Sequence, residues 1–220
     1  MSLLKLIITR DGSLSLLNTV LNETYHSVHG AVQESNHVFI EKGLHVAAAK
    51  NTSLKILEIG FGTGLNALLT LQHAQVSQRT IDYTSLEAFP VPEEIWSALN
   101  YTQTPESKDL FEKLHRAGWN DKTVILPNFY LQKLHTTLQQ TELNLNYFDL
   151  VYFDAFAPNK QPEMWELPML QKVTNAMKPG GLFVTYCAKG QLKRDLKSLN
   201  LLVETLQGPP GKREMISASK

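Results

Sequence analysis

Three glycines near residue 60 are the first residues of the chain whose type and spacing point to chemistry. Gly60, Gly62 and Gly64 follow the acidic Glu58 in the order Glu-x-Gly-x-Gly-x-Gly, between an apolar run typical of a buried strand and a leucine-rich stretch with helical spacing. Glycines at such a turn let the backbone approach a ligand closely. A dinucleotide fingerprint needs its third glycine at position 65, which is leucine here. The pattern therefore favours a loop that binds a cofactor other than a dinucleotide. The alternative is a glycine-rich turn that binds no ligand.

Carboxylates also stand at the ends of predicted strands. Glu87 follows residues 81–86, where one carboxylate can accept hydrogen bonds from both hydroxyls of a ribose, unless it is simply solvated. Asp154 follows residues 148–153. Because a primary amine is mostly protonated at neutral pH, an acid there could hold the amine and receive its proton, or else cap the following turn. Glu58 could bind a cofactor's ammonium group directly or through water, or else cap the amides of the glycine loop.

The elements that position these residues alternate between strand and helix from about residue 53, which predicts a parallel sheet covered on both faces. A short connection near the end of the chain favours an antiparallel final pair. The predicted strands lie over residues 54–59, 81–86, 123–126, 148–153, 182–187, 201–206 and 214–218, and the predicted helices over 64–74, 94–99, 107–117 and 164–177, with a break at 178–181.

The pattern of residues 1–45 predicts a small unit separate from the main domain. Residues 4–17 alternate in the strand manner around Asp11-Gly12, a strong hairpin signal. We therefore expect a β-rich extension over residues 1–45, followed by the main domain over 46–220. His26, His29 and His37 fall in this first part without a convincing metal-binding pattern, so no metal site is expected.

Composition narrows the possible partners and the compartment. The 220 residues include 21 basic and 21 acidic side chains, so the net charge of zero argues by itself against nucleic acid. However, residues 189–220 hold seven basic and three acidic side chains, which predicts weak, salt-sensitive and local RNA binding. Cys187 is the single cysteine, so an internal disulfide is excluded. The chain shows neither a secretory signal nor a membrane span, and we expect a cytoplasmic protein.

Several segments occur together in an order that resembles a known family. The glycine pattern is similar to the first motif of class I S-adenosylmethionine-dependent methyltransferases. Nearly the whole chain resembles the methyltransferase domain of the bacterial bifunctional tRNA 5-methylaminomethyl-2-thiouridine biosynthesis protein. The segments that carry this resemblance are Asp-Gly-Ser at 11–13, residues 25–39, Gly-Phe-Gly-Thr-Gly-Leu-Asn at 60–66, Asp-Ala-Phe-Ala-Pro at 154–158, Pro-Glu-Met-Trp at 162–165 and Gly-Lys-Arg-Glu-Met at 211–215.

The resemblance implies a fold and a reaction. The fold would be α/β and Rossmann-like, with a mostly parallel sheet, an antiparallel last strand and the small β-rich extension. The reaction would transfer a methyl group from S-adenosyl-L-methionine to the amine of 5-aminomethyl(-2-thio)uridine at the tRNA wobble position. The chain has no room for the family's oxidase domain, so a separate enzyme would supply that amine. Two alternatives are a small-molecule amine methyl- or aminopropyltransferase, and a noncatalytic tRNA- or protein-binding module.

The resemblance also completes the set of candidate site residues. Asp154 would prepare the amine nucleophile. The candidates for cofactor binding are Glu34, Glu58, Gly60, Gly62, Gly64, Glu87 and Asn128, of which Asn128 would contact adenine and Glu34 would close over the methionine end unless it only packs in the extension.

The candidates for substrate binding fall into two kinds. Aromatic and apolar residues after Asp154 could form a wall for a flipped base or simply belong to the core, and basic residues could contact tRNA phosphates or simply be solvated. These candidates are Phe156, Pro158, Met164 and Trp165, and Lys189, Lys212 and Arg213.

Overall fold

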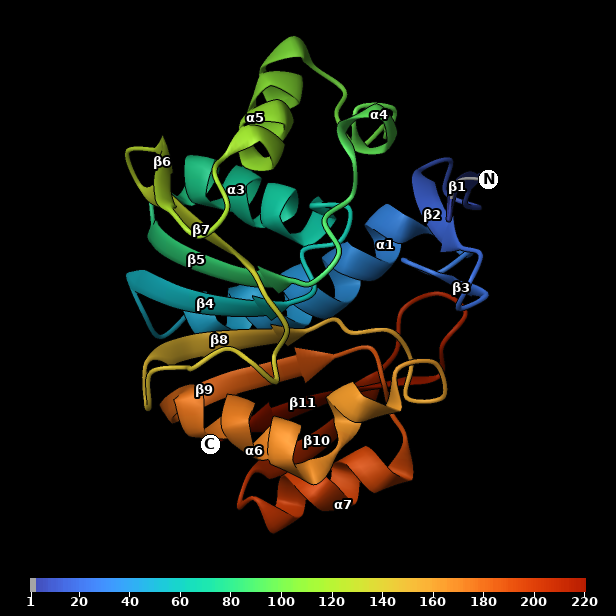
Figure 1. The fold of residues 1–220 in the computed structure, drawn as a ribbon. Coiled ribbons are helices and arrows are strands. Elements are labelled where there is room, and N and C mark those ends of the chain that lie inside the picture. Colours follow the sequence, from blue (N-terminus) through green and yellow to red (C-terminus); the bar gives the residue numbers. More distant parts are fainter. Residues whose placement is uncertain (1–2) are drawn as a thin grey trace.

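The computed structural model describes residues 3–220 and builds them around an eight-stranded sheet (Figure 1). The strand order is β10-β11-β9-β8-β4-β5-β7-β6. The five central strands are parallel, and the strands at both edges run antiparallel to their neighbours. The strands are β4 (Ser53–Ile59), β5 (Thr80–Glu87), β6 (Lys122–Leu126), β7 (Phe129–His135), β8 (Phe148–Phe153), β9 (Met177–Thr185), β10 (Leu202–Gln207) and β11 (Glu214–Ser219).

Helices cover both faces of the sheet because its strands are apolar on both sides. Along β8, Leu150 and Tyr152 belong to one core, whereas Val151 and Phe153 belong to a second core on the opposite face. The sheet therefore separates two hydrophobic cores, as the predicted α/β fold requires. The helices that follow β4 are α3 (Leu65–Ser77), α4 (Glu93–Trp96), α5 (Pro105–Arg116), η2 (Pro162–Trp165), α6 (Leu167–Ala176) and α7 (Gly190–Ser198).

The predicted hairpin at the start of the chain is confirmed. β1 (Leu4–Ile8) pairs antiparallel with β2 (Leu14–Asn18), and β3 (Glu23–Thr24) completes a small sheet of its own. Asp11 fastens the connecting turn, because its Oδ1 accepts hydrogen bonds from the Thr9 hydroxyl at 2.7 Å and the Ser13 amide at 3.0 Å. The Asp-Gly signal thus marks the turn correctly.

The predicted β-rich extension is β-rich only as far as Thr24. Residues 31–48 form consecutive helical segments, namely α1 (Ala31–Ser35), the π-helical η1 (Asn36–Leu44) and α2 (His45–Ala48). They pack on the main sheet so closely that a Cβ on Gly43 would lie 3.0 Å from a Val184 methyl group. The predicted division between residues 45 and 46 falls inside this helical stretch and stays a prediction.

Two further details differ from the sequence prediction. Strand β7 was not predicted; it forms an antiparallel hairpin with β6 at the edge of the sheet. The predicted break at residues 178–181 lies inside β9, where the register with β8 shifts and the chain bulges without leaving the sheet. Between residues 3 and 220, no helix is long and apolar enough to cross a membrane.

Candidate active site

The carboxyl ends of three neighbouring strands meet at one point of the sheet. β4 lies between β5 and β8, so the chain leaves β4 where the strand order reverses, and open α/β sheets bind ligands at such a point. Backbone hydrogen bonds join the three ends: the Gly60 amide donates to the Leu86 carbonyl at 2.9 Å, and the Asp154 amide donates to the Ile59 carbonyl at 3.1 Å. The predicted glycine loop and the two predicted acidic strand ends are therefore side by side.

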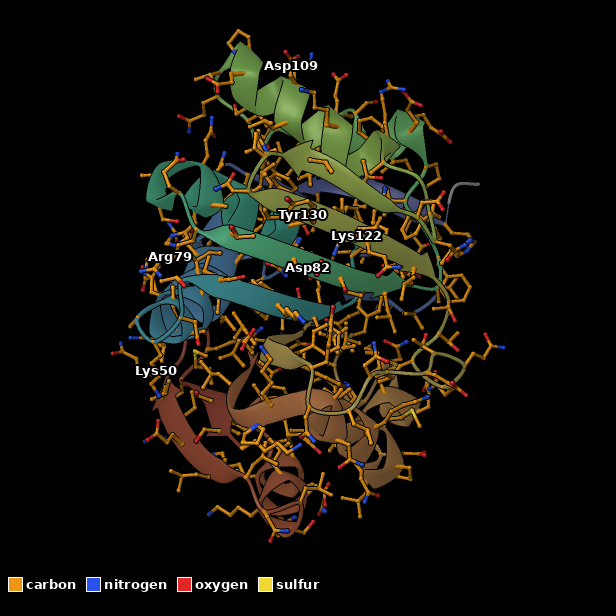
Figure 2. All side chains as sticks on the ribbon, turned by 90° about the vertical axis from the view of Figure 1, so that its left-hand side faces the viewer. Lys50, Arg79, Asp82, Asp109, Lys122 and Tyr130 are labelled. Carbon is orange, nitrogen blue, oxygen red and sulfur yellow. The ribbon has the colours of Figure 1, made fainter. Side chains whose placement is uncertain are left out.

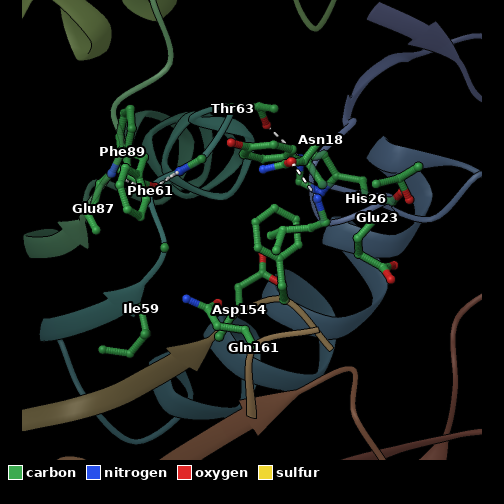
Figure 3. Close-up of a pocket in the computed structure, with 18 of the residues that line it drawn as sticks. Asn18, Glu23, His26, Ile59, Phe61, Thr63, Glu87, Phe89, Asp154 and Gln161 are labelled. Atoms are coloured by element: carbon green, nitrogen blue, oxygen red, sulfur yellow. Dashed lines mark hydrogen bonds between the residues drawn. The ribbon is translucent and has the colours of Figure 1, made fainter. Parts of the chain in front are cut away.

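A cavity of about 1160 Å³ opens above these strand ends. Its floor is formed by the glycine loop and the ends of β5 and β8, and its wall by the N-terminal hairpin sheet and the segment that follows it. Figure 3 shows Asp154 at the end of its strand, Glu87 on one side of the cavity and His26 on the other, where His26 bonds Thr63 of the glycine loop. The small N-terminal sheet thus completes the cavity that the main sheet begins.

Two of the three loop glycines bring the backbone up to this cavity. Gly60 has a φ of +95°, and a Cβ there would lie 3.1 Å from the Asp154 carbonyl oxygen. Gly62 also lines the cavity, and a Cβ there would lie 3.2 Å from the Tyr25 ring. Gly64 does not line it, because its Cα faces the rings of His115 and Phe61 below the loop. The third glycine therefore serves packing.

Glu87 holds the loop from the end of β5. Its Oε2 accepts the Gly62 amide at 2.9 Å, and its Oε1 accepts the Phe89 amide at 2.8 Å. Burial raises the pKa of this carboxyl, although the backbone amides work in the opposite direction. Glu87 lines the cavity, so its carboxylate can receive polar groups of a ligand at the predicted position.

Asp154 presents a carboxyl to the cavity, and no basic side chain of the part of the chain that the structure describes forms an ion pair with it. Its Oδ2 accepts a hydrogen bond from the Asn66 side-chain amide at 2.8 Å. Burial, followed by the nearby negative charge of Glu34, raises the pKa of Asp154 to about 7, while Asn66 and Lys212 lower it. A carboxyl with a pKa near the operating pH is suited to accept a proton during a reaction.

Glu34 and Lys212 meet at the same cavity from distant parts of the sequence. The Lys212 ammonium forms an ion pair with Glu34 Oε1 and lies 3.7 Å from the centre of the Tyr186 ring. Glu34 Oε2 accepts the Ser27 amide at 2.7 Å. Lys212 therefore points inward and neutralises a buried carboxylate, which corrects the prediction that it lies on a phosphate-binding surface.

The structure does not bring Glu58 to the cavity. Its side chain is completely buried on β4 below the glycine loop, where its Oε2 accepts a hydrogen bond from the Ser85 hydroxyl at 2.6 Å. Burial raises the pKa of Glu58 to about 8. Direct binding of a cofactor ammonium group by Glu58 is therefore contradicted.

Asn128 lies at the wrong end of the sheet for its predicted role. It immediately precedes β7, and its side-chain amide donates to the carbonyls of Ala74 and Arg79 at 2.8 and 2.9 Å. Figure 2 looks onto this amino-terminal edge, where Arg79 and Tyr130 are labelled. The adenine contact is contradicted because the unpredicted strand β7 begins, and does not end, beside Asn128.

Two of the four residues predicted to form an aromatic and apolar wall line the cavity, and their contact with a base stays a prediction. Phe156 and Met164 line the cavity, and the Phe156 ring packs edge-to-face on Tyr25 with centroids 5.0 Å apart. Trp165 instead packs on Phe153 in the second core, with its indole N–H donated to the Phe156 carbonyl at 2.7 Å. Pro158 is absent from the cavity lining. Core packing therefore accounts for Trp165, and its predicted contact with a base is wrong.

The remaining predicted basic residues lie outside the cavity. Lys189 is exposed at the start of α7, and Arg213 is exposed just before β11.

The three histidines of the first part contact protein groups: His26 bonds the Thr63 hydroxyl at 2.6 Å, His29 bonds Arg10, and His37 bonds the Gln207 carbonyl. Within residues 3–220, no three His, Cys, Asp or Glu side chains lie where they could together hold a metal ion.

Sequence reasoning missed several residues at the cavity. Burial lowers the pKa of His26 to about 4, so a neutral imidazole faces Thr63. Phe89 stands at the edge of the cavity with 78% of its surface exposed. The only signal for Asn66 is its place two residues after the glycine loop, within a motif that carried the resemblance.

Comparison with known proteins agrees with this arrangement. The family model described as S-adenosyl-L-methionine-dependent methyltransferase matches residues 94–220. The tRNA 5-methylaminomethyl-2-thiouridine biosynthesis bifunctional protein MnmC of Pseudoalteromonas atlantica is 33% identical over 90% of this chain and 31% of its own length. The MnmC protein of Nitrosospira multiformis is 27% identical over 91% of this chain and 34% of its own. The chain thus spans about a third of the length of these relatives.

Solved structures give the same result. The crystal structure of MnmC2 from Aquifex aeolicus superposes with a TM-score of 0.82 at 26% identity, over 100% of this chain and 71% of that one. Spermidine synthase from Thermotoga maritima has a TM-score of 0.58 at 15% identity, over 98% of this chain and 68% of that one, a likeness of fold alone. With a family model matching more than half of its residues, the chain belongs to the S-adenosyl-L-methionine-dependent methyltransferases.

Proposed function

We propose that this protein transfers a methyl group from S-adenosyl-L-methionine to the amine of 5-aminomethyl(-2-thio)uridine at the tRNA wobble position. The product is 5-methylaminomethyl(-2-thio)uridine. The observation that carries the proposal is the Asp154 carboxyl, which lines the cavity beside the glycine loop, has a pKa raised to about 7 and forms no ion pair within residues 3–220. The names of the relatives, which refer to biosynthesis of this modified uridine, support the choice of substrate.

The glycine loop and Glu87 fit the cofactor. At Gly60 and Gly62 the backbone borders the cavity where any side chain would crowd Asp154 or Tyr25. Glu87 offers a carboxylate at the end of β5 that would accept hydrogen bonds from ribose hydroxyls. The bound cofactor supplies an electrophilic methyl group on its sulfonium. Because the cavity also holds Glu34 and Lys212, these two charges would receive the ammonium and carboxylate of the methionine end.

Asp154 prepares the second substrate. A primary amine is mostly protonated at neutral pH, and the ammonium form has no lone pair with which to attack. The ionised Asp154 carboxylate would accept one of these protons and keep the freed amine oriented. The hydrogen bond from Asn66 fixes the position of the carboxylate. Because Lys212 pairs with the neighbouring Glu34, the ionised Asp154 carboxylate itself supplies the negative charge that would attract the cationic amine.

The mouth of the cavity suits a nucleobase. Phe89 and Phe156 provide aromatic faces, and Met164 adds an apolar contact. Bases that are read in single-stranded loops commonly stack on such side chains. Outside the cavity, exposed Lys189 and Arg213 would contact tRNA phosphates. Replacing both with alanine should weaken tRNA binding and flatten its salt dependence by about one to two units of log–log slope.

Methyl transfer does not itself create the aminomethyl group, so a separate activity must supply it. The direct test is therefore incubation of the protein with S-adenosyl-L-methionine and tRNA that carries unmethylated aminomethyluridine, followed by nucleoside mass spectrometry. We expect the wobble nucleoside to gain one methyl group. Methylation or aminopropylation of free polyamines without change in the tRNA would instead identify a small-molecule enzyme. Binding of tRNA with no transfer to either substrate would identify a noncatalytic module.

A further inference from the structure

Two histidines from distant parts of the chain bond the same residue of the glycine loop. Thr63 lies between Gly62 and Gly64, lines the cavity and is only 1% exposed. His26 Nε2 lies 2.6 Å from the Thr63 hydroxyl oxygen, a hydrogen bond that Figure 3 marks with a dashed line. His115 Nε2 lies 3.2 Å from the Thr63 carbonyl oxygen. Thr63 is therefore bonded through its side chain to one part of the molecule and through its backbone to another.

His115 holds the loop from the side of α5. Its ring stacks on Trp96, with centroids 4.5 Å apart and 12° between the planes, and it meets the Phe111 ring edge-on at 4.5 Å. The His115 carbonyl oxygen accepts a hydrogen bond from the Lys133 ammonium at 2.6 Å. Because a carbonyl oxygen can only accept a hydrogen bond, His115 Nε2 carries a hydrogen and donates it to Thr63. The position of the Thr63 backbone is therefore fixed by a ring that is itself held by its neighbours.

His26 approaches the loop from the small N-terminal sheet of β1, β2 and β3. The His26 amide donates to the Ser15 hydroxyl on β2 at 3.1 Å, and the His26 carbonyl accepts a hydrogen bond from the Thr24 hydroxyl on β3 at 2.7 Å. Both His26 and Ser15 are buried. The backbone of His26 is thus bonded to the small sheet, while its side chain is bonded to the glycine loop.

Both imidazoles act through hydrogen bonds and not through charge. Burial lowers the pKa of His26 to about 4 and that of His115 to about 3, so both rings are neutral at physiological pH. An apolar side chain could fill either buried position without the cost of burying ring nitrogens. The hydrogen bonds to Thr63 therefore explain why these two buried positions hold histidine.

We propose that His26 is a positioning residue that ties the small N-terminal sheet to the glycine loop through Thr63, so that binding of S-adenosyl-L-methionine and ordering of this sheet favour each other. A ligand that restrains the loop also restrains Thr63, and the bond to His26 passes this restraint to the sheet. The coupling is reciprocal by linkage. Because Asn18 and Glu23 of the same sheet line the cavity, the tie also fixes its wall. The link depends on the family to which the chain belongs, and not on the identity of the methyl acceptor.

A double-mutant cycle tests whether His26 acts through Thr63. His26→Leu removes the ring nitrogen, and Thr63→Val removes the hydroxyl at nearly constant shape. Each should weaken binding of S-adenosyl-L-methionine about tenfold in titration calorimetry, and the double variant should bind little worse than either single variant. His26→Gln and Thr63→Ser, which keep a hydrogen-bonding group, should recover most of the affinity. Additive losses of about 100-fold in the double variant would overturn the proposal.

Hydrogen exchange of backbone amides separates the tie from a general contribution to folding. Saturating S-adenosyl-L-methionine should slow exchange in residues 14–24 about tenfold in the wild type and in His45→Leu, which replaces an exposed histidine on α2. In His26→Leu and Thr63→Val the saturating cofactor should slow these amides less than about twofold. Equal slowing in all four proteins would show that His26 only packs, and the proposal would fail. Neither measurement uses tRNA, so a failure to methylate tRNA would refute the proposed function and leave this link intact.

Discussion

Strands β5 and β8 each have two carboxylates, one near the amino end of the strand and one at its carboxyl end. The surroundings of these carboxylates differ between the amino edge and the carboxyl edge of the sheet. At the amino edge, Asp82 pairs with the Lys122 ammonium at 2.7 Å, and Asp149 pairs with the Lys178 ammonium at 2.7 Å (Figure 2 labels the first pair). At the carboxyl edge, neutral N–H groups hold Glu87 and Asp154, and burial raises both pKa values.

The difference separates structural carboxylates from functional ones. A lysine that pairs with a carboxylate satisfies its charge, so nothing remains for a ligand to neutralise. Amide donors hold a carboxylate in place but leave its net charge. The carboxyl edge therefore keeps unneutralised groups at a cavity, and such perturbed groups are typical of functional sites. Substituting the matched residues on each strand tests this contrast.

The largest expected effect is at β8. Asp154→Asn should lower the rate of single-turnover methyl transfer by about 100-fold or more, because the amide cannot accept the amine proton. Asp149→Asn should leave the rate within about twofold, since the ion pair with Lys178 that it weakens lies at the opposite edge of the sheet from the cavity. Equal losses in the two variants, measured by rapid quench, would remove the distinction between the two ends.

A smaller effect is expected at β5. Glu87→Ala should weaken binding of S-adenosyl-L-methionine by at least about tenfold, because the carboxylate both receives the ligand and holds the Gly62 amide. Asp82→Ala, at the other end of the strand, should bind as the wild type does. Titration calorimetry on both variants gives the comparison, and wild-type affinity in Glu87→Ala would rule out the proposed contact.

The smallest effect concerns the charge beside Asp154. Lys212→Met removes a cation that lowers the Asp154 pKa and leaves Glu34 unpaired, so the pH at which the rate is half-maximal should increase by roughly half a unit. Lys193→Met breaks an ion pair with Glu214 away from the cavity and serves as the control. A decrease in the midpoint for Lys212→Met would contradict the assigned electrostatics.

The sequence was sufficient to predict the part of the site that follows from strand order. Residues 148–153 are recognisable from the sequence as a buried strand, and a parallel sheet brings the ends of its strands to one edge. The sequence alone therefore predicts that Asp154, Glu87 and the glycine loop lie at the same edge of the sheet. The antiparallel final pair was predictable from its short connection and is confirmed. Local patterns of this kind persist because burial enforces them.

The rest of the site depends on contacts between distant residues. Nothing local indicates that Lys212 reaches Glu34, or that residues 31–48 form helices that bring Glu34 to the cavity. The role of Asn128 was predicted wrongly because β7 was not recognised. The role of Trp165 was predicted wrongly because the sequence does not distinguish an aromatic side chain that faces a ligand from one that packs in the core. Tertiary packing decided each case.

The pH dependence of single-turnover transfer to aminomethyluridine-containing tRNA tests the central claim most directly. Asp154 must be ionised to accept the amine proton, so at saturating cofactor the rate should rise with pH and reach half of its maximum near pH 7. In Asp154→Asn this inflection should disappear together with most of the rate. An unchanged inflection in Asp154→Asn, or a full rate below pH 6, would show that another group receives the proton.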